Sequence, residues 1–253
     1  MSETAPVSMV DRVVLILEAF QRGSATLSLA DIAEVTRLPR SSTHRIVQQL
    51  LAARWLDRCE GGYRLGLGIF ELGSLVADRN RIVTAARPFM QQLSAGRYVV
   101  HVGMRDDRDV VYLDKVGGPF AGKLPSRIGG RLPAHCTGVG KAILAYSEPE
   151  VVDAYFSGGL EARTPHSLAD PTLLRSALRK IRAVGLAFDL SEAVEGVECV
   201  AAPLFDTNGV CAAISVSGPT GHVDQQLLGR SVRMAAIAIS RRLGGAHFAI
   251  RSA

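Results

Sequence analysis

The segment from Leu27 to Leu65 constrains the fold of this chain more than any other part of the sequence. Ser28 precedes apolar residues that recur at helical spacing, and Asp31 falls in the first turn, so Ser28 is placed to cap a short helix. The residue before a proline avoids the helical conformation, so Pro39 ends this helix and suits the first turn of a second one. Two short helices joined by a tight turn are typical of a helix-turn-helix.

The second helix has one apolar face and one polar face. Its apolar stripe consists of Thr43, Ile46, Val47 and Leu50, and the opposite face, near the N-terminal end, carries Arg40, Ser41, His44 and Gln48. Side chains like those on the polar face donate hydrogen bonds to phosphate oxygens and to base edges. The sequence therefore predicts that this helix reads DNA.

The residues that follow the second helix predict a β-hairpin. Residues 55–58 and 63–65 flank Cys59-Glu60-Gly61-Gly62, and a pair of glycines between two strand-like segments favours a tight turn. A hairpin directly after a helix-turn-helix would form the wing of a winged helix.

Positive charge is concentrated on these elements. Residues 35–66 hold six arginines against two acidic residues, a net charge of +4, whereas residues 1–34 hold two arginines against five acidic residues, a net charge of −3. A surface that neutralises a phosphate backbone has this distribution. The alternative is an ordinary solvated basic face, but it does not account for a turn and a hairpin in this order. The residues expected at the DNA are Ser28, Arg37, Arg40, Ser41, Ser42, His44, Arg45, Gln48, Arg58 and Arg64.

Length and composition describe a globular protein. The 253 residues suffice for two domains with separate cores, and 47% apolar and 21% charged residues are ordinary for such proteins. No signal peptide or long apolar run occurs, and the four cysteines form no Cys-x-x-Cys pair. These observations predict a cytoplasmic protein that does not contact a membrane, and they argue against a structural zinc site.

The remaining segments predict an α+β organisation. Strand-like runs over 99–104 and 110–116, joined by 105–109, and over 186–189, 196–205 and 211–219 alternate with helices over 82–93, 149–156, 171–184 and 224–243. Ser167 or Asp170 is placed to cap the helix over 171–184. A pair of strands, then helices, then three strands and a helix predict an antiparallel sheet as the core.

Two further helices are predicted outside the sheet region. A helix over 10–20 forms a three-helix core with the two described above, and a helix over 69–77 has apolar residues around most of its surface. The latter helix either joins the domains and supplies dimer contacts or packs only on its own domain. The expected domains are a DNA-binding domain over 1–66, a linker helix over 67–80 and a second domain over 81–253.

A glycine-rich turn over 137–140 leads into a further helix. A Walker phosphate loop would need glycine at His135 and a hydroxyl residue at Ala142, so the turn is not such a loop. The free amides at the start of a helix can still bind a small anion.

Several motifs together resemble the IclR family of bacterial transcription regulators, and they span nearly the whole chain. They are residues 15–20 (LILEAF), 38–45 (LPRSSTHR), 63–66 (YRLG), 132–142 (LPAHCTGVGKA) and 196–203 (GVECVAAP). The resemblance implies a winged helix-turn-helix, a linker helix and a C-terminal effector-binding domain with a GAF-like fold. It also implies a homodimer or homotetramer that binds palindromic double-stranded DNA, with recognition helices about 34 Å apart.

The resemblance further implies that a small organic acid, aliphatic or aromatic, controls the protein and that the target is a catabolic operon. In relatives that sense small carboxylates the matching positions are Gly138, Val139, Asp189, Cys199, Ser215 and Ser217. Amides and hydroxyls bind a carboxylate, whereas Asp189 accepts from a hydroxyl or water and repels an anion directly. The alternative is that Ser215 and Ser217 only line a sheet face and that Cys199 is a small core residue.

Two other classes of function stay open at this point. An enzyme would use Cys199 or Cys136 as nucleophile and His135 as base, but the usual catalytic motifs are absent and sequence neighbours rarely face each other. A redox or metal sensor would use the cysteines, with His135 and Cys136 as partial ligands. The leading interpretation remains a ligand-responsive repressor or activator, with no catalytic residue, no metal ligand and no cofactor.

Overall fold

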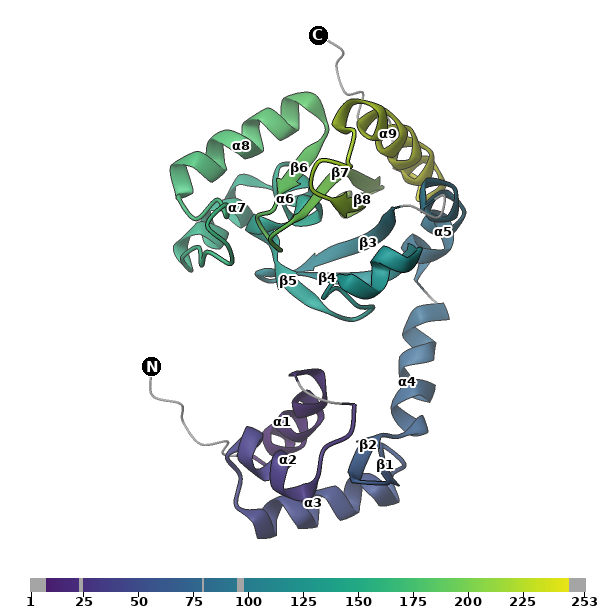
Figure 1. The fold of residues 1–253 in the computed structure, drawn as a ribbon, viewed down its shortest axis with the longest axis vertical. Helices are drawn as coiled ribbons and strands as arrows, with labels where there is room; N and C mark the ends of the chain where they lie inside the picture. Colours follow the sequence, from purple (N-terminus) through teal and green to yellow (C-terminus); the bar gives the residue numbers. More distant parts are fainter. Residues whose placement is uncertain (1–7, 23–24, 79, 95–97, 246–253) are drawn as a thin grey trace. The chain divides into compact units, whose positions relative to one another are not determined.

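The computed structural model describes residues 8–22, 25–78, 80–94 and 98–245, and Figure 1 shows their helices and strands. The chain forms two compact units, residues 1–80 and 81–253. Both the predicted DNA-binding domain and the predicted linker fall in the first unit, so a separate linker over 67–80 stays a prediction. Within the described ranges no helix has the length and apolarity needed to cross a membrane.

The first unit contains three packed helices, a hairpin and a further helix: α1 (Met9–Arg22), α2 (Leu29–Thr36), α3 (Arg40–Ala52), β1 (Leu56–Cys59), β2 (Gly62–Leu65) and α4 (Leu67–Asp78). Its core draws on the first five of these elements. The buried side chains include Ile16, Ile32, Ile46, Leu56 and Tyr63, one from each. The predicted winged helix-turn-helix is confirmed.

Local chemistry sets the ends of the first helices. The Ser28 hydroxyl accepts a hydrogen bond from the Asp31 amide at 3.2 Å, and the Asp31 carboxylate accepts from the Ser28 amide at 2.8 Å. This capping box starts α2 where the sequence predicts. Arg37 has a left-handed backbone with φ of 54°, which ends α2. Pro39 is the N-cap residue of α3, which begins at Arg40, so it lies just before the first turn in which it was predicted.

The wing is fixed to the start of α2. β1 and β2 pair antiparallel, with Cys59 opposite Gly62. Gly62 has φ of 148°, and a side chain there would meet the Leu27 carbonyl oxygen at 2.3 Å, so the position requires glycine. Leu27 and Tyr63 also exchange two backbone hydrogen bonds of 3.0 and 2.9 Å. The hairpin therefore has a defined place beside the helices.

The second unit is built on an antiparallel sheet with strand order β5-β4-β3-β8-β7-β6, so the predicted α+β class is confirmed. The strands are β3 (Val99–Asp106), β4 (Asp109–Gly117), β5 (Arg131–Pro133), β6 (Ala187–Leu190), β7 (Val197–Asp206) and β8 (Gly209–Pro219). The helices are α5 (Arg81–Ser94), α6 (Gly138–Leu144), α7 (Pro149–Ser157), α8 (Pro171–Val184) and α9 (Gln225–Arg242), with short 3-10 turns at Pro119–Lys123 and Ala134–Cys136.

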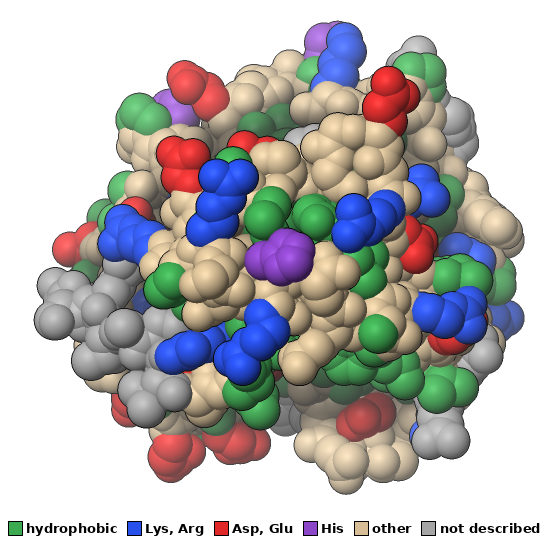
Figure 2. Space-filling model, turned by 90° about the horizontal axis from the view of Figure 1, so that it is seen from below, with side chains coloured by type: hydrophobic (Ala, Val, Ile, Leu, Met, Phe, Trp, Pro, Cys, Tyr) green, Lys and Arg blue, Asp and Glu red, His purple; other side chains and the backbone are tan. Residues whose placement is uncertain are grey.

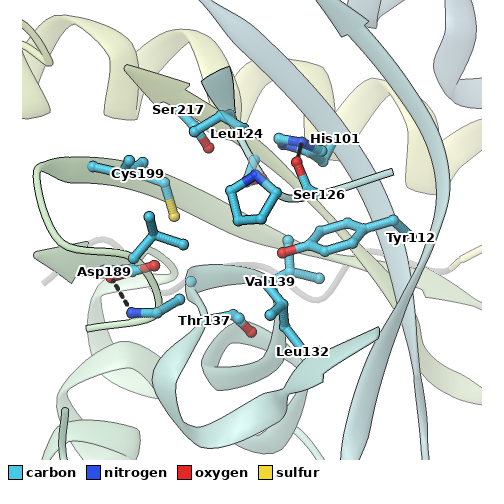
Figure 3. A pocket seen from close by; sticks show the side chains of 16 residues that line it. His101, Tyr112, Leu124, Ser126, Leu132, Thr137, Val139, Asp189, Cys199 and Ser217 are labelled. Carbon is cyan, nitrogen blue, oxygen red and sulfur yellow. Dashed lines mark hydrogen bonds between the residues drawn. The ribbon is translucent and has the colours of Figure 1, made fainter. Parts of the chain in front are cut away.

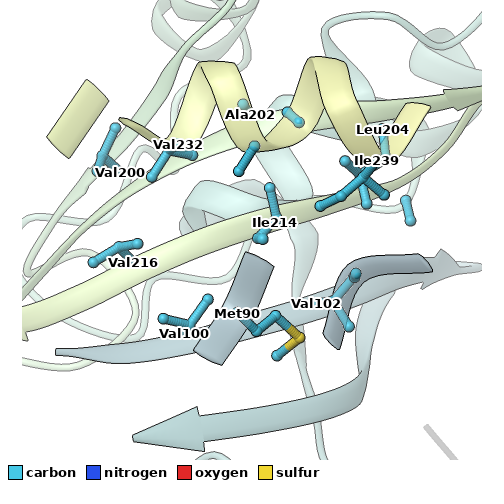
Figure 4. Close-up of a cluster of buried hydrophobic side chains, with 14 of the residues drawn as sticks. Met90, Val100, Val102, Val200, Ala202, Leu204, Ile214, Val216, Val232 and Ile239 are labelled. Carbon is cyan, nitrogen blue, oxygen red and sulfur yellow. The ribbon is translucent and has the colours of Figure 1, made fainter. Parts of the chain in front are cut away.

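The two faces of this sheet bury separate cores, because side chains alternate along each strand. One face packs against α5 and α9 through even-numbered residues of β3, β7 and β8, among them Val100, Val102, Val200, Ile214 and Val216 (Figure 4). The other face packs against α6 and α8 and includes the small residues Ala187, Ala201 and Ala213. Other residues of this face, among them Asp189, Cys199 and Ser215, line a pocket beside α6.

Two details of the prediction need correction. β3 runs to Asp106 and β4 starts at Asp109, so the connection has two residues, with Asp107 at φ of 55°, and not the five expected. The strands continue past the apolar runs because their charged ends pair as strands too. Of the two caps considered for α8, Asp170 and not Ser167 fills the role, since its carboxylate accepts from the first amides of the helix at 2.8 Å.

Candidate functional site

α3 presents a polar face at the surface while its other face anchors it in the core. The predicted apolar stripe of Thr43, Ile46, Val47 and Leu50 is buried. Arg40, Ser41, His44 and Arg45 are exposed, and Ser42 and Gln48 are partly exposed. Figure 2 views the molecule from below, which is the side where Figure 1 draws α3. It shows Lys or Arg side chains around a histidine side chain. A helix that is rigidly held and carries exposed donors suits entry into a major groove.

The other predicted DNA-binding residues lie on the turn and the hairpin. Arg37 is exposed in the turn before α3, and Arg58 and Arg64 are exposed on β1 and β2. The hydroxyl of Ser28 is engaged in the cap of α2. Arg54, which the sequence-based list omits, forms a 3.4 Å ion pair with an acidic residue of α4. In the first unit, α3, β1 and β2 follow one another along the chain, and each carries at least one exposed arginine.

A pocket lies between the sheet and α6 in the second unit. It encloses about 430 Å³ not filled by protein atoms, solvent at its mouth included. All six strands contribute to its lining, through His101, Tyr112, Leu132, Asp189, Cys199 and Ser215 among others. The six residues predicted for an effector site all line it: Gly138, Val139, Asp189, Cys199, Ser215 and Ser217.

The start of α6 forms one end of this pocket. Thr137 caps the helix, its hydroxyl accepting from the Gly140 amide at 3.0 Å. The amides of Gly138 and Val139 belong to the first turn, where a helix offers no acceptor, and both residues line the pocket. A side chain at Gly138 would meet the Cys199 sulfur at 2.5 Å, so one of the two would have to shift.

Asp189 faces the pocket from β6 and is held by backbone amides. Its Oδ1 accepts from the Glu192 amide at 2.7 Å and from the Ala193 amide at 3.4 Å. Burial raises the pKa of Asp189 from its ordinary value to about 7, against the opposing effect of nearby Lys141. Asp189 is therefore a hydrogen-bonding group whose charge depends on pH near neutrality.

An ion pair that was not predicted from the sequence lies near Asp189. Lys141 of α6 contacts the Glu192 carboxylate, and the two side chains are only 2% and 8% exposed. Burial raises the pKa of Glu192, and its second carboxylate oxygen has no hydrogen-bond partner among the described residues. A lysine inside an otherwise apolar helix is the only sequence signal for this pair, because Glu192 lies far along the chain.

Three further polar residues of the pocket were also missed. His101 donates to or accepts from the Ser126 hydroxyl at 2.8 Å, and its ring lies 4.9 Å from the ring of Tyr112. Figure 3 shows these side chains on the opposite side of the pocket from Asp189 and Thr137. His101 alternates with valines in a strand-like run, a pattern that gives no hint of a pocket.

The geometry leaves no support for a cysteine nucleophile or a metal sensor. His135 is engaged on both ring nitrogens, with the Tyr155 hydroxyl and the Glu161 carbonyl oxygen, each at 2.9 Å. Burial raises the pKa of Cys136 to about 12 and also raises that of Cys199, so both thiols stay protonated. The described residues contain no group of three or more side chains able to hold a metal ion.

Asp189→Asn is expected to raise the free energy of unfolding at pH 8 and to change it little at pH 4. Between these values the folded protein keeps a proton that the unfolded chain, with its aspartate pKa near 3.8, has released, so wild-type stability falls as pH rises. The shift to about 7 corresponds to about 4 kcal/mol at most. Asparagine keeps an acceptor for the two amides and has no such cost.

Urea denaturation at pH 4, 6 and 8 measures this difference. Asp153→Asn is the control, because Asp153 is 63% exposed. A difference between Asp189→Asn and wild type that does not change with pH would contradict the assignment of a buried, protonated carboxyl.

Comparison with known proteins identifies relatives of both units. The IclR helix-turn-helix domain matches residues 9–59, and the C-terminal domain of bacterial IclR transcriptional regulators matches residues 74–241. The HTH-type transcriptional regulator XynR of Escherichia coli K12 is 33% identical over 246 residues, which cover 94% of this chain and 98% of XynR. The repressor AllR of Salmonella typhi is 32% identical over 93% of this chain and 89% of its own.

Solved structures agree with this assignment. An IclR homologue from Microbacterium hydrocarbonoxydans, crystallised with 4-hydroxybenzoate, superposes with a TM-score of 0.84 at 28% identity, covering 93% of this chain and 99% of that one. The Thermotoga maritima IclR structure superposes with a TM-score of 0.77 at 28% identity, covering 93% and 98%.

Proposed function

Since the chain belongs to the IclR family of bacterial transcription regulators, it is a DNA-binding regulator and not an enzyme, and we propose that a small organic acid bound in the pocket controls its affinity for a promoter. The acid is aliphatic or aromatic, and the regulated genes form a catabolic operon. The protein works in the cytoplasm, where its DNA is.

The DNA-binding part of this proposal is supported by the first unit. Arg40 and His44 lie exposed on α3, while Arg58 and Arg64 lie exposed on the hairpin. In winged helices of this arrangement, α3 enters the major groove and specifies the site, and arginines elsewhere contact phosphates.

The effector part is supported by one observation above all. Residues from four separate segments of the chain line a single pocket: Gly138 and Val139, Asp189, Cys199, and Ser215 with Ser217. The first amides of α6 and the hydroxyls of Ser215 and Ser217 are suitable donors for a carboxylate. A relative that superposes closely was crystallised with 4-hydroxybenzoate, an aromatic acid.

A homodimer or homotetramer fits the surface of α4. Five apolar side chains of this helix are more than half exposed: Leu67, Phe70, Leu72, Leu75 and Val76. Pairing of such faces is expected to form a dimer, and a dimer of this kind reads a palindromic site whose half-sites lie about 34 Å apart.

Binding of the purified protein to its own upstream DNA tests the proposal. We expect a specific complex at fixed salt concentration, and a shift of its affinity by one or more members of a panel of aliphatic and aromatic carboxylates. The expected shift is about 5- to 150-fold, the usual size of such coupling. No specific complex at any salt concentration would contradict the proposal.

Gly138→Ala is expected to abolish the response to acids while leaving DNA binding intact. The new methyl group would lie 2.5 Å from the Cys199 sulfur, so either the start of α6 or the Cys199 side chain must shift, and both line the pocket. Calorimetry with the acid that shifts DNA binding most measures the loss, expected to be at least about tenfold. Gly122→Ala is the matched control, because nothing lies within 4 Å of the added methyl group. Unchanged acid binding in Gly138→Ala would contradict this site.

A further inference from the structure

Asp189 lies in one row of side chains with two other residues of the proposed acid site. Strand register places Asp189 of β6 opposite Cys199 of β7, and Cys199 opposite Ser217 of β8. Neighbouring strands are about 4.7–4.9 Å apart, and Figure 3 shows the three side chains one after another along one side of the pocket. Gly138 of α6 lies over the middle of this row, because a side chain there would meet the Cys199 sulfur at 2.5 Å. A carboxylate bound by the α6 amides and Ser217 would therefore lie within one or two strand spacings of Asp189.

Two negative charges at this distance would have no cation in the pocket to compensate them. The described residues that line the pocket include no lysine and no arginine, and Asp189 is the one acidic residue among them. Lys141, whose charge acts on Asp189, contacts the Glu192 carboxylate, so this buried pair is neutral as a whole. Arg163 is exposed, and its Nε donates to the Ala193 carbonyl oxygen at 3.3 Å. An acid anion beside an ionised Asp189 would therefore be repelled.

The other titratable groups around Asp189 keep their charge state near neutral pH. Three of them act on Asp189 from separate elements: Cys136 of the 3-10 turn before α6, Cys199 of β7 and Tyr112 of β4. Burial raises the pKa of all three groups, so they keep their protons. Burial lowers the pKa of His101, in the next row of the sheet, to about 3, so its imidazole stays neutral. Asp189 is therefore the lining residue that can gain a proton when an anion binds.

A proton on Asp189 would convert the repulsion into a hydrogen bond. Oδ1 accepts from the amides of Glu192 and Ala193 at 2.7 and 3.4 Å, and it can do so whether or not the group is charged. The proton is then placed on Oδ2, from which it is donated to the acid, as in other pairs of carboxyl groups that share one proton. Asp189 is only 6% exposed, and burial favours its uncharged form even without a bound acid.

We propose that Asp189 binds the acid as a protonated carboxyl group, so that each acid anion is bound together with one proton from solvent. This inference rests on the proposed function, since it assumes that the carboxylate lies at the start of α6. It makes Asp189 a hydrogen-bond donor to the acid. Control of the promoter by the acid weakens as pH rises, because more of the free protein must then take up a proton before the acid can bind.

Calorimetry on the full-length protein counts these protons. The probes are benzoate, butyrate and the acid of the panel that shifts promoter binding most. Titrations at pH 6 and pH 8, each in two buffers with different heats of ionisation, give the number of protons taken up per bound acid. Since the pKa of Asp189 is about 7, we expect about 0.1 proton at pH 6 and about 0.9 at pH 8, with about tenfold weaker binding at pH 8.

Asp189→Asn assigns the proton to this residue. An asparagine amide donates a hydrogen bond without a change of charge, so the variant is expected to bind the acids without proton uptake and with equal affinity at pH 6 and pH 8. Asp153→Asn is the matched control, because Asp153 is exposed on α7 and does not line the pocket, and it is expected to keep the wild-type proton uptake. The urea denaturation midpoint of each variant checks that it is folded.

The outcomes separate this inference from the proposed function. Uptake of nearly one proton at pH 8 that disappears in Asp189→Asn would support the inference. If the acids bind at pH 8 without proton uptake, or if Asp189→Asn keeps the uptake, the inference is overturned and the proposed function stands. If no acid of the panel binds the folded wild-type protein even at pH 6, the proposed effector site fails and the inference fails with it.

Discussion

Arg40→Ala is expected to weaken binding to the promoter site by at least about tenfold without unfolding the protein. Arg40 is the first residue of α3 and is exposed, so its loss leaves the buried face of the helix unchanged. An arginine that bonds to a base contributes about 1–3 kcal/mol of discrimination, and a dimer loses the contact in both subunits. Fluorescence anisotropy with labelled promoter DNA at one stated salt concentration measures the change.

His44→Ala tests the same face of α3 one turn further on. It is expected to weaken binding as well, since His44 is exposed beside Gln48, whose side chain lies 3.4 Å from the His44 ring. Arg175→Ala serves as a control, because Arg175 belongs to the second unit and pairs there with Asp153. Unchanged promoter affinity in both α3 variants would contradict the assignment of α3 as the recognition helix.

Lys141→Met is expected to lower the free energy of unfolding by about 3–5 kcal/mol. The substitution leaves the Glu192 carboxylate buried without a cation, and one of its oxygens already lacks a partner among the described residues. The loss should be smaller at low pH, because Glu192 can then take up a proton, a change that its raised pKa favours. Urea denaturation at pH 5 and pH 8 measures both effects.

The double variant Lys141→Met with Glu192→Gln distinguishes an unpaired charge from lost packing. We expect it to recover a large part of the stability, since no buried charge remains. Arg175→Ala removes an exposed ion pair of similar type and is expected to cost less than about 1 kcal/mol. A double variant as unstable as Lys141→Met alone would contradict the electrostatic account.

Local patterns in the sequence predicted most of the fold. Ser28, Asp31 and Pro39 determine the ends of α2 and α3 through capping and backbone preferences, which depend only on neighbouring residues. Strand-like runs bounded by turns likewise located five strands of the sheet, whereas the three-residue strand β5 was not predicted. The connection between β3 and β4 was predicted too long because its charged residues resemble a loop although they pair as strand ends.

The pocket could be predicted only in part. Gly138 and Cys199 were identified because they lie in motifs that resemble a known family, and Ser217 because it matches a position of relatives that sense carboxylates. The structure brings all three to one pocket. The pairs Lys141–Glu192 and His101–Ser126 join residues 51 and 25 positions apart. Such contacts depend on strand order and register, which no local pattern encodes.

The most direct test of the whole account measures coupling between the two units in both directions. Promoter affinity is determined with and without saturating amounts of the acid that binds most tightly, and the affinity for that acid is determined with and without saturating promoter DNA. If the acid controls the regulator, the two factors must be equal and different from one, because coupling between two binding sites is reciprocal. Acid and DNA that both bind but leave each other's affinity unchanged would contradict the account.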